Sequence, residues 1–205
     1  MTFYKTHILP KLTHWVCARK LFDYQRKKVV PLARGRILEI GMGSGLNLPF
    51  YDPLQVDHLY GLEPSDTLRK IARKNAAGLP FPVGFIGLPG EEIPLETHSM
   101  DTVLVTYTLC TIPDIHQALS QMRRVLKPGG RLIFCEHGLA PDPGIRKWQE
   151  RINPVWNRLT GGCSLNRHIS DLITYNGFAI QTMSARYQNA VKIASFTYRG
   201  IAVPV

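Results

Sequence analysis

The sequence predicts an α/β fold in which a mostly parallel sheet carries helices on both of its faces. From residue 36 onwards, short apolar runs alternate with helix-like segments, which is the pattern of βαβ units. A glycine-rich turn directly follows the first apolar run, as in folds that bind nucleotide-like ligands. At 205 residues the chain is long enough for one domain with a complete core. We therefore expect residues 1–205 to form a single domain, with residues 35–205 as its core and residues 1–34 as a preceding helical segment.

The strands are predicted from short runs rich in aliphatic and β-branched residues, each bounded by turn residues. Helical segments separate most of the first five runs, which are therefore expected to form a mostly parallel sheet. The last two follow one another with a tight link at Asn189, which predicts an antiparallel hairpin at one edge of the sheet. The predicted strands span residues 36–40, 58–62, 82–88, 101–106, 131–135, 178–187 and 190–203.

The helices are predicted from apolar residues at helical spacing and from their capping residues. Asp114 is a suitable N-cap for a helix that runs to Leu126, and the tripeptide Pro-Gly-Gly at 128–130 then stops it. Residues 3–30 also carry an apolar stripe, with Pro10 as an interruption. The other predicted helices span residues 65–75, 143–160 and 167–175, with a short one at 47–51.

Positive charge is concentrated at the N-terminal end of the chain. The net charge is +10, and residues 1–36 hold nine Lys or Arg side chains but a single acid, Asp23. A solvated basic helix face explains this pattern most simply, and contact with an anionic membrane surface is an alternative. No basic stripe with interleaved aromatic residues occurs elsewhere, so no nucleic-acid partner is expected. Because the segment precedes the first strand, we expect it to lie over the ligand cleft as a lid.

The composition excludes several classes of protein. No run of 18 apolar residues occurs, so no membrane-spanning helix is expected. Basic residues interrupt the N-terminal apolar stretch, which therefore lacks the pattern of a signal peptide. The four cysteines have neither a Cys-x-x-Cys pair nor a metal-ligand spacing. We therefore expect a cytoplasmic, monomeric protein with reduced thiols and no bound metal.

The glycine-rich turn is the most informative motif in the chain. Residues 38–45 read Leu-Glu-Ile-Gly-Met-Gly-Ser-Gly, which places Glu39 before Gly41, Gly43 and Gly45. Glycines in such a turn let the backbone approach a ligand where a Cβ would block it. A dinucleotide fingerprint needs glycine or alanine where this chain has Leu46, which argues against a nicotinamide-dependent oxidoreductase. The spacing Glu-x-Gly-x-Gly-x-Gly instead resembles motif I of class I S-adenosylmethionine-dependent methyltransferases.

This resemblance implies a Rossmann-like fold with seven strands in the order 3-2-1-4-5-7-6, and S-adenosylmethionine as the cofactor. The ligand would lie outside the carboxyl ends of the strands, with the glycine turn under its methionine moiety. Glu63, followed by Pro64, ends the second strand and would accept hydrogen bonds from both ribose hydroxyls. Many relatives have an aspartate where this chain has Pro89, so we expect backbone groups of Gly90 and Glu91 to bind the adenine. Thr106 completes the predicted cofactor site.

A closer resemblance, over residues 36–203, is carried by motifs in the second half of the chain. It is to the methyltransferase-like 7 group, whose animal members are membrane-anchored alkyl-thiol methyltransferases, and to bacterial relatives known as type 11 methyltransferases. The pairs Glu136-His137 and Gly162-Cys163 are more specific than the Pro-Gly-Gly tripeptide, which is generic. The remaining motifs lie at residues 109–112, 124–130 and 153–156.

The resemblance favours a small-molecule thiol as the methyl acceptor. His137, just past the fifth predicted strand, is the candidate base or orienting residue. Arg167 is interpreted as a solvated residue or as a partner for an acidic substrate. Methyl transfer to a lipid amine or quinone precursor at a membrane surface is the second hypothesis, and a nucleic-acid-binding protein is the third. The candidate acceptor-site residues are Tyr107, Cys110, Trp156 and Cys163. A structural role is the simpler explanation for Cys110, Trp156 and Cys163, whereas the two roles explain Tyr107 equally well.

Overall fold

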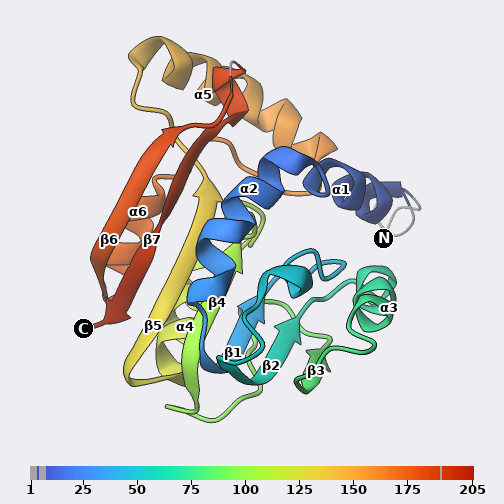
Figure 1. Ribbon diagram of the computed structural model, residues 1–205. Helices are drawn as coiled ribbons and strands as arrows, with labels where there is room; N and C mark the ends of the chain where they lie inside the picture. Colours follow the sequence, from blue (N-terminus) through green and yellow to red (C-terminus); the bar gives the residue numbers. More distant parts are fainter. Residues whose placement is uncertain (1–3, 5–7, 190) are drawn as a thin grey trace.

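The fold is a single seven-stranded sheet with the strand order β3-β2-β1-β4-β5-β7-β6, which confirms the predicted order (Figure 1). The computed structural model describes residue 4, residues 8–189 and residues 191–205. Strand β7 runs antiparallel to both of its neighbours, and the other pairings are parallel. The strands are β1 (Gly35–Ile40), β2 (Val56–Leu62), β3 (Val83–Ile86), β4 (Met100–Thr106), β5 (Leu126–His137), β6 (Phe178–Tyr187) and β7 (Phe196–Pro204).

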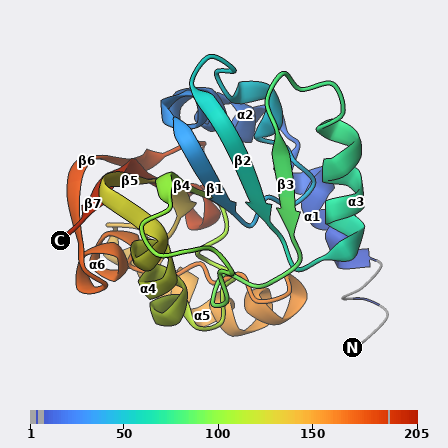
Figure 2. The ribbon, with the colours of Figure 1, turned by 90° about the horizontal axis from the view of Figure 1, so that it is seen from below.

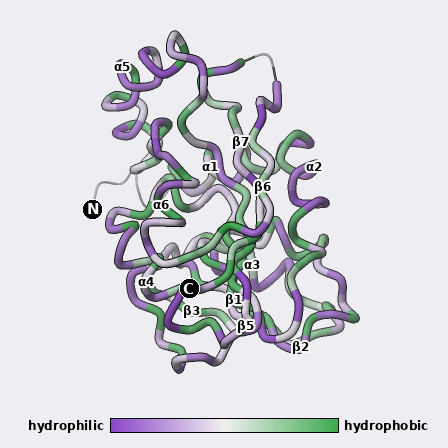
Figure 3. The backbone as a smooth tube through the Cα atoms, turned by 90° about the vertical axis from the view of Figure 1, so that its left-hand side faces the viewer, coloured by the Kyte–Doolittle hydropathy of each residue, from purple (hydrophilic) through white to green (hydrophobic). Residues whose placement is uncertain are grey.

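Helices cover both faces of this sheet (Figure 2). Helices α4 (Ile115–Val125) and α6 (Ile169–Tyr175) pack on one face, where Leu119 and Ile173 meet buried side chains of β1, β4 and β5. Helices α2 (Lys20–Val29) and α3 (Asp66–Asn75) pack on the other, through Val29 and Ala72. Hydrophobic stretches gather in the strands, whereas the outer helix α5 (Pro143–Leu159) is largely hydrophilic (Figure 3).

Helices α1 (Leu9–Cys17) and α5 lie at the carboxyl edge of the parallel strands (Figure 1). The hydroxyl of Tyr4 donates to the carbonyl of Leu159 over 2.6 Å, which joins the start of the chain to the end of α5. In the described part of the chain, no helix is long and apolar enough to cross a membrane. The N-terminal segment therefore reaches the edge of the sheet where folds of this type bind ligands.

The predicted interruption of the N-terminal helix at Pro10 is wrong. Pro10 lies in the first turn of α1, where its missing N–H is not needed and its fixed φ suits the helix. The break lies instead at Arg19, whose ψ of 146° is extended. A short 3₁₀ turn, η2 (Val30–Leu32), then leads into β1. Residues 1–3 and 5–7 of the predicted segment are outside the described part of the chain.

Two predicted boundaries in the C-terminal half are also wrong. Strand β5 begins at Leu126 and includes the tripeptide at 128–130, which forms an irregularity in its pairing with β4, with Gly129 at a φ of 77°. The link at Asn189 is longer than predicted, because the 3₁₀ turn η4 (Lys192–Ala194) precedes β7. Helix η3 (Leu48–Phe50), in contrast, is as short as the sequence indicates.

Candidate active site

A cavity of about 900 Å³ opens at the carboxyl ends of β1, β2 and β4. Its walls are the glycine turn, the end of β2, the loops after β3 and β4, and helix α1. Gly45 lies behind the glycine turn, where a Cβ would meet the side chain of Leu48. The predicted cofactor residues that line the cavity are Glu39, Gly41, Gly43, Glu63, Pro64, Gly90, Glu91 and Thr106.

The glycine turn is shaped by left-handed backbone conformations. Gly41 and Gly43 have φ values of 67° and 59°, which L side chains rarely adopt. The N–H groups of Gly41 and Met42 donate to the carbonyl of Leu62 over 2.8 and 3.1 Å, which fixes the turn against the end of β2. A Cβ on Gly41 would run into the side chain of Thr108. Gly41 therefore lets the loop after β4 pack directly against the turn.

The carboxylate of Glu63 is held at the cavity wall by two backbone donors. Its Oε2 accepts from the N–H of Gly43 over 3.0 Å and its Oε1 accepts from the N–H of Ser65 over 2.8 Å. Only 8% of the residue is exposed, and this burial raises the pKa of its carboxyl. Each carboxylate oxygen has a second acceptor position, so Glu63 retains capacity for two further donors from a ligand.

Glu39 is the centre of a buried network beneath the turn. Its carboxylate accepts from the Asn47 amide over 2.9 Å and from the Tyr51 hydroxyl over 2.7 Å. Burial raises the pKa of Glu39 to about 7, against the opposing effect of these hydrogen bonds. The same Asn47 amide donates to Thr106 over 3.0 Å, so Glu39 and Asn47 fix the turn relative to the end of β4.

The N-terminal helices are bound to this network by residues that the sequence analysis did not single out. Arg26 on α2 is buried, and its Nε donates to Asn47 Oδ1 over 3.1 Å. Its Nη1 donates to the carbonyl of Cys17 over 2.8 Å, which also holds the end of α1. His14 and Ser44 are hydrogen-bonded over 2.6 Å. The burial of Arg26 could not be predicted from the sequence, because Arg26 lies in a run of basic residues and composition does not distinguish a buried arginine from an exposed one.

The loop after β3 contributes an acceptor to the far end of the cavity. Glu91 Oε1 accepts from the N–H of Asp114 over 3.2 Å. Glu91 Oε2 is buried and has no partner among the residues that the structure describes. Since buried carboxylate oxygens are normally hydrogen-bonded, this atom is suited to a donor on a ligand.

The loop after β4 is held in a strained conformation. Tyr107 has a φ of 53°, which is uncommon for a residue with a Cβ. Its N–H donates to the carbonyl of Cys135 over 2.9 Å, and its ring packs edge-on against Phe22. Arg167, which the sequence led us to interpret as solvated or substrate-binding, instead donates to the carbonyls of Leu109 and Ile112, the latter over 2.7 Å. Arg167 therefore braces this loop.

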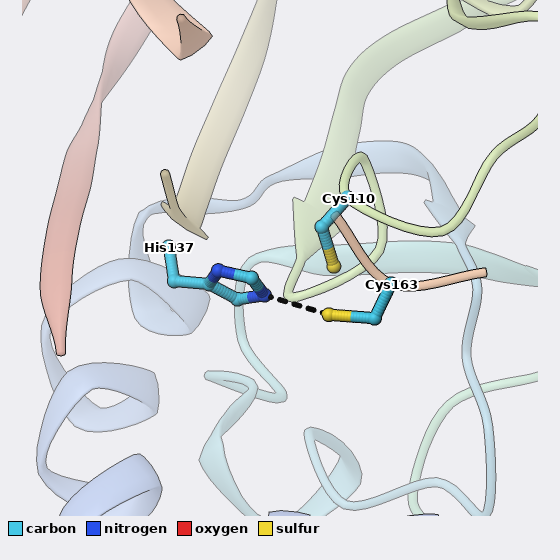
Figure 4. A group of neighbouring side chains, drawn as sticks. All are labelled: Cys110, His137 and Cys163. Carbon is cyan, nitrogen blue, oxygen red and sulfur yellow. Dashed lines mark hydrogen bonds between the residues drawn. The ribbon is translucent and has the colours of Figure 1, made fainter. Parts of the chain in front are cut away.

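Three more of the predicted residues meet next to that loop (Figure 4). The ligating atoms of Cys110, His137 and Cys163 lie within 4.8 Å of one another, and Cys163 Sγ is 3.2 Å from His137 Nε2. Trp156 Nε1 donates to Cys163 Sγ over 3.5 Å. None of these four lines the cavity, but the adjacent Thr111 and the nearby glycine at 161 do.

The electrostatics of this group favour a thiolate at Cys163. Hydrogen bonds to the Cys110 thiol and to the His137 imidazole lower the pKa of Cys163. Burial lowers the pKa of His137, but its hydrogen bond to Cys163 outweighs that effect and the net shift is upward. Beside them, burial raises the pKa of Glu136 to about 7. Its Oε1 accepts from the N–H of Thr108 over 2.8 Å.

Comparison with known proteins identifies the family. Residues 38–134 match a family model described as a methyltransferase domain. The human thiol S-methyltransferase TMT1B is 32% identical over an alignment of 167 residues, which covers 78% of this chain and 67% of that protein. The chain belongs to the class I methyltransferases. Its expected activity, S-adenosylmethionine-dependent methyl transfer, is thereby confirmed, with S-adenosylmethionine as the cofactor.

Further relatives of this methyltransferase differ in the acceptor that their names give. A demethylmenaquinone methyltransferase from Clavibacter sepedonicus is 28% identical over 121 residues, which make up 59% of this chain and 49% of that protein. The chain thus spans about half to two thirds of the length of these curated relatives. A methyltransferase structure from Thermotoga maritima superposes with a TM-score of 0.64 at 21% identity, covering 97% of this chain and 96% of its own, which shows the shared fold.

The cavity of the methyltransferase fits S-adenosylmethionine. Glu63 offers two free acceptor positions at the end of β2, which suit vicinal ribose hydroxyls. Glu91 Oε2, an unpaired buried acceptor, suits the amino group of adenine, where the sequence analysis considered only backbone groups. The turn leaves room for the methionine part at Gly43, which lines the cavity and where a Cβ would meet no atom closer than 3.9 Å.

Proposed function

We propose that this protein transfers the methyl group of S-adenosylmethionine to the sulfur of a small thiol. The observation that carries the proposal is the 32% identity with the human thiol S-methyltransferase TMT1B, which extends over 78% of this chain. The matched length includes most of the catalytic core, so the similarity is not confined to the generic glycine turn.

The donor supplies a methyl group on a positively charged sulfur, and the protein positions it. Glu63 and Glu91 would hold its ribose and adenine ends, and the glycine turn would contact its methionine end, since all of these residues line the cavity. The N-terminal helices, linked to the turn through Arg26 and His14, act as a lid that excludes water. In-line displacement at a sulfonium needs positioning and a dry path more than acid–base catalysis.

The acceptor side suits a sulfur nucleophile. The cavity wall formed by the loop after β4 presents hydroxyl and apolar groups, among them Tyr107, Thr108 and Ile112. A thiol has a thiolate fraction of about a few per cent at pH 7 and is strongly nucleophilic in that form, so it needs less help from a base than amines and alcohols do. Nε2 of His137, the candidate base, is already hydrogen-bonded to Cys163 and is therefore less available to accept a proton from a substrate. An acceptor that ionises by itself is therefore the best match.

A panel of acceptors tests this proposal. An alkyl thiol, a phenol, a primary amine and a demethylated quinone are each incubated with S-adenosylmethionine, and the methylated products are measured by mass spectrometry. We expect kcat/KM for the thiol to exceed that for every other acceptor at least tenfold. The Glu63→Ala variant is the control for donor-dependent transfer and should lose activity toward all acceptors. Preferential methylation of the phenol, amine or quinone would contradict the thiol assignment.

A quinone precursor or lipid amine at a membrane surface is the second candidate. Apolar side chains are exposed on α1 and α5, among them Leu12, Trp15, Val155 and Leu159, of which Trp15 is 60% exposed. Leu12 and Trp15 belong to the basic N-terminal segment, and exposed apolar side chains among basic residues are typical of helices that bind anionic membranes. Co-sedimentation with anionic but not with neutral vesicles, and methylation of a vesicle-embedded quinone precursor, would support this alternative. Equal sedimentation with both kinds of vesicle would count against it.

A further inference from the structure

Three soft donor side chains converge beside the cofactor cavity. Cys110 follows β4, His137 ends β5 and Cys163 follows α5. Their ligating atoms lie within 4.8 Å of one another and point toward one another (Figure 4). Zinc bonds of about 2.3 Å to sulfur and about 2.0 Å to nitrogen place tetrahedral ligand atoms about 3.6 Å apart. The 3.2 Å between Cys163 Sγ and His137 Nε2 is within a few tenths of an ångström of that spacing.

The backbone around these ligands is fixed before any ion binds. The N–H of Ser164 donates to the carbonyl of Cys110 over 2.9 Å, which ties the two cysteine loops directly together. Asn157 donates to the carbonyl of Gly162 over 2.7 Å. Arg167 holds both sides of the Cys110 loop through the carbonyls that follow and precede it. Such preorganisation is what separates a metal site from a chance cluster of side chains.

The chemistry of the three ligating side chains indicates which metal ion they would bind. Two thiolates and one imidazole are ligands for zinc, and no carboxylate takes part. Three protein ligands leave the fourth tetrahedral position open, as in catalytic rather than structural zinc sites. Thr111 and Gly161, which lie near Cys110 and Cys163 in the chain, line the cofactor cavity. The group of three ligands therefore borders the cofactor cavity.

We propose that Cys110, His137 and Cys163 bind a zinc ion whose fourth position takes the sulfur of the methyl acceptor. The metal site rests on the three ligands alone, whereas its role in binding the acceptor rests on the proposed thiol methylation. The acceptor thiol releases its proton to solvent as its sulfur binds zinc. That sulfur then attacks the methyl carbon, and the electron pair of the broken C–S bond stays on the donor, giving neutral S-adenosylhomocysteine. The thioether product is a weak ligand and leaves.

Metal content and cobalt substitution test the site. The full-length protein is purified under reducing conditions, stripped with chelator and reloaded with Zn²⁺ or Co²⁺. We expect one equivalent of metal and thiolate-to-cobalt charge-transfer absorption. Cys110→Ser, Cys163→Ser and His137→Gln should each weaken metal binding at least tenfold. Cys17→Ser, which removes a thiol outside the group of three, should retain it. Circular dichroism verifies that each variant is folded, and Trp156→Phe gives a folded comparison with all three ligands present.

The outcomes separate the two parts of the inference. No metal uptake by the wild type, or full uptake by the three ligand variants, would overturn the site. Loss of metal in Cys17→Ser would indicate a closed site of four protein ligands and would overturn the open position. Adding 2-mercaptoethanol to the cobalt protein should increase the charge-transfer absorption, and an unchanged spectrum would refute binding of the acceptor sulfur. Cobalt binding in a protein that methylates no thiol would leave the site standing and refute the proposed function.

Discussion

Because its carboxyl is buried, Glu39 should make the free energy of unfolding of this protein depend on pH. The residue is 1% exposed, and burial raises the pKa of its carboxyl to about 7. In the unfolded chain a glutamate has a pKa of about 4.3. Between these values the native state binds a proton that the unfolded state has lost, so the contribution of Glu39 to stability is fully present below about pH 4 and is lost as the pH rises through 7.

The size of this effect follows from the two pKa values. One pH unit in that interval corresponds to about 1.4 kcal/mol, so Glu39 should reduce the free energy of unfolding by about 2.5 kcal/mol between pH 5 and pH 8. Glu39→Gln removes the titration but keeps the network. The Gln carbonyl accepts from Asn47, and its amide donates to Tyr51, whose hydroxyl can also accept.

Urea unfolding followed by circular dichroism at several pH values and constant ionic strength measures this difference. The stability of Glu39→Gln relative to the wild type should increase by about 2.5 kcal/mol from pH 5 to pH 8. Subtracting the wild type removes the contribution of Glu136, which is common to both proteins. Glu150→Gln, a change of an exposed carboxyl on α5, is the matched control and should run parallel to the wild type. A constant difference between Glu39→Gln and the wild type would refute the reasoning.

Three further perturbations test the donor cavity, the lid and the cysteine group. Gly41→Ala forces a Cβ toward Thr108 at a φ of 67° and should weaken S-adenosylhomocysteine binding at least tenfold by calorimetry; unchanged affinity would contradict the role given to the turn. Arg26→Met leaves the acceptor oxygens of Asn47 and Cys17 unpaired and should lower the free energy of unfolding, measured in urea, by about 3 kcal/mol. A decrease below about 0.5 kcal/mol would contradict this role of Arg26. Iodoacetamide at pH 6 should label Cys163 in the metal-free protein well before Cys135, whose thiol pKa burial raises to about 12, and equal labelling by mass spectrometry would oppose the assignment.

The donor side of the site is readable from the sequence because its determinants are local. Gly41 and Gly43 are needed at one turn, and Glu63 ends the strand that pairs beside it. These positions are linked by short stretches of chain, and parallel strands bring their carboxyl ends to one edge. The alternation of strands and helices predicts a mostly parallel sheet, whereas the strand order was predicted from the resemblance to class I methyltransferases.

The arrangement of the residues on the acceptor side could not be predicted from the sequence in this way. Cys110, His137 and Cys163 follow three different elements, and their spacing along the chain resembles no metal motif. Only the β4–β5 pairing and the return of the chain after α5 bring them together. Arg26 was missed for a similar reason, since its partner Asn47 lies across the turn. Pro10 was misread because proline is tolerated in the first turn of a helix and excluded only from its interior.

The loop after β4 links the two halves of the site and is held from every side. Thr108 is bound by Glu136, the carbonyls at 109 and 112 by Arg167, and the carbonyl of Cys110 by Ser164. This bracing sustains the left-handed Tyr107, whose strain costs about 1–3 kcal/mol. A loop held by so many hydrogen bonds is not expected to move aside when a ligand enters or leaves. We propose that entry and release of ligands depend instead on α1, which contacts the glycine turn through His14 and carries exposed side chains such as Trp15.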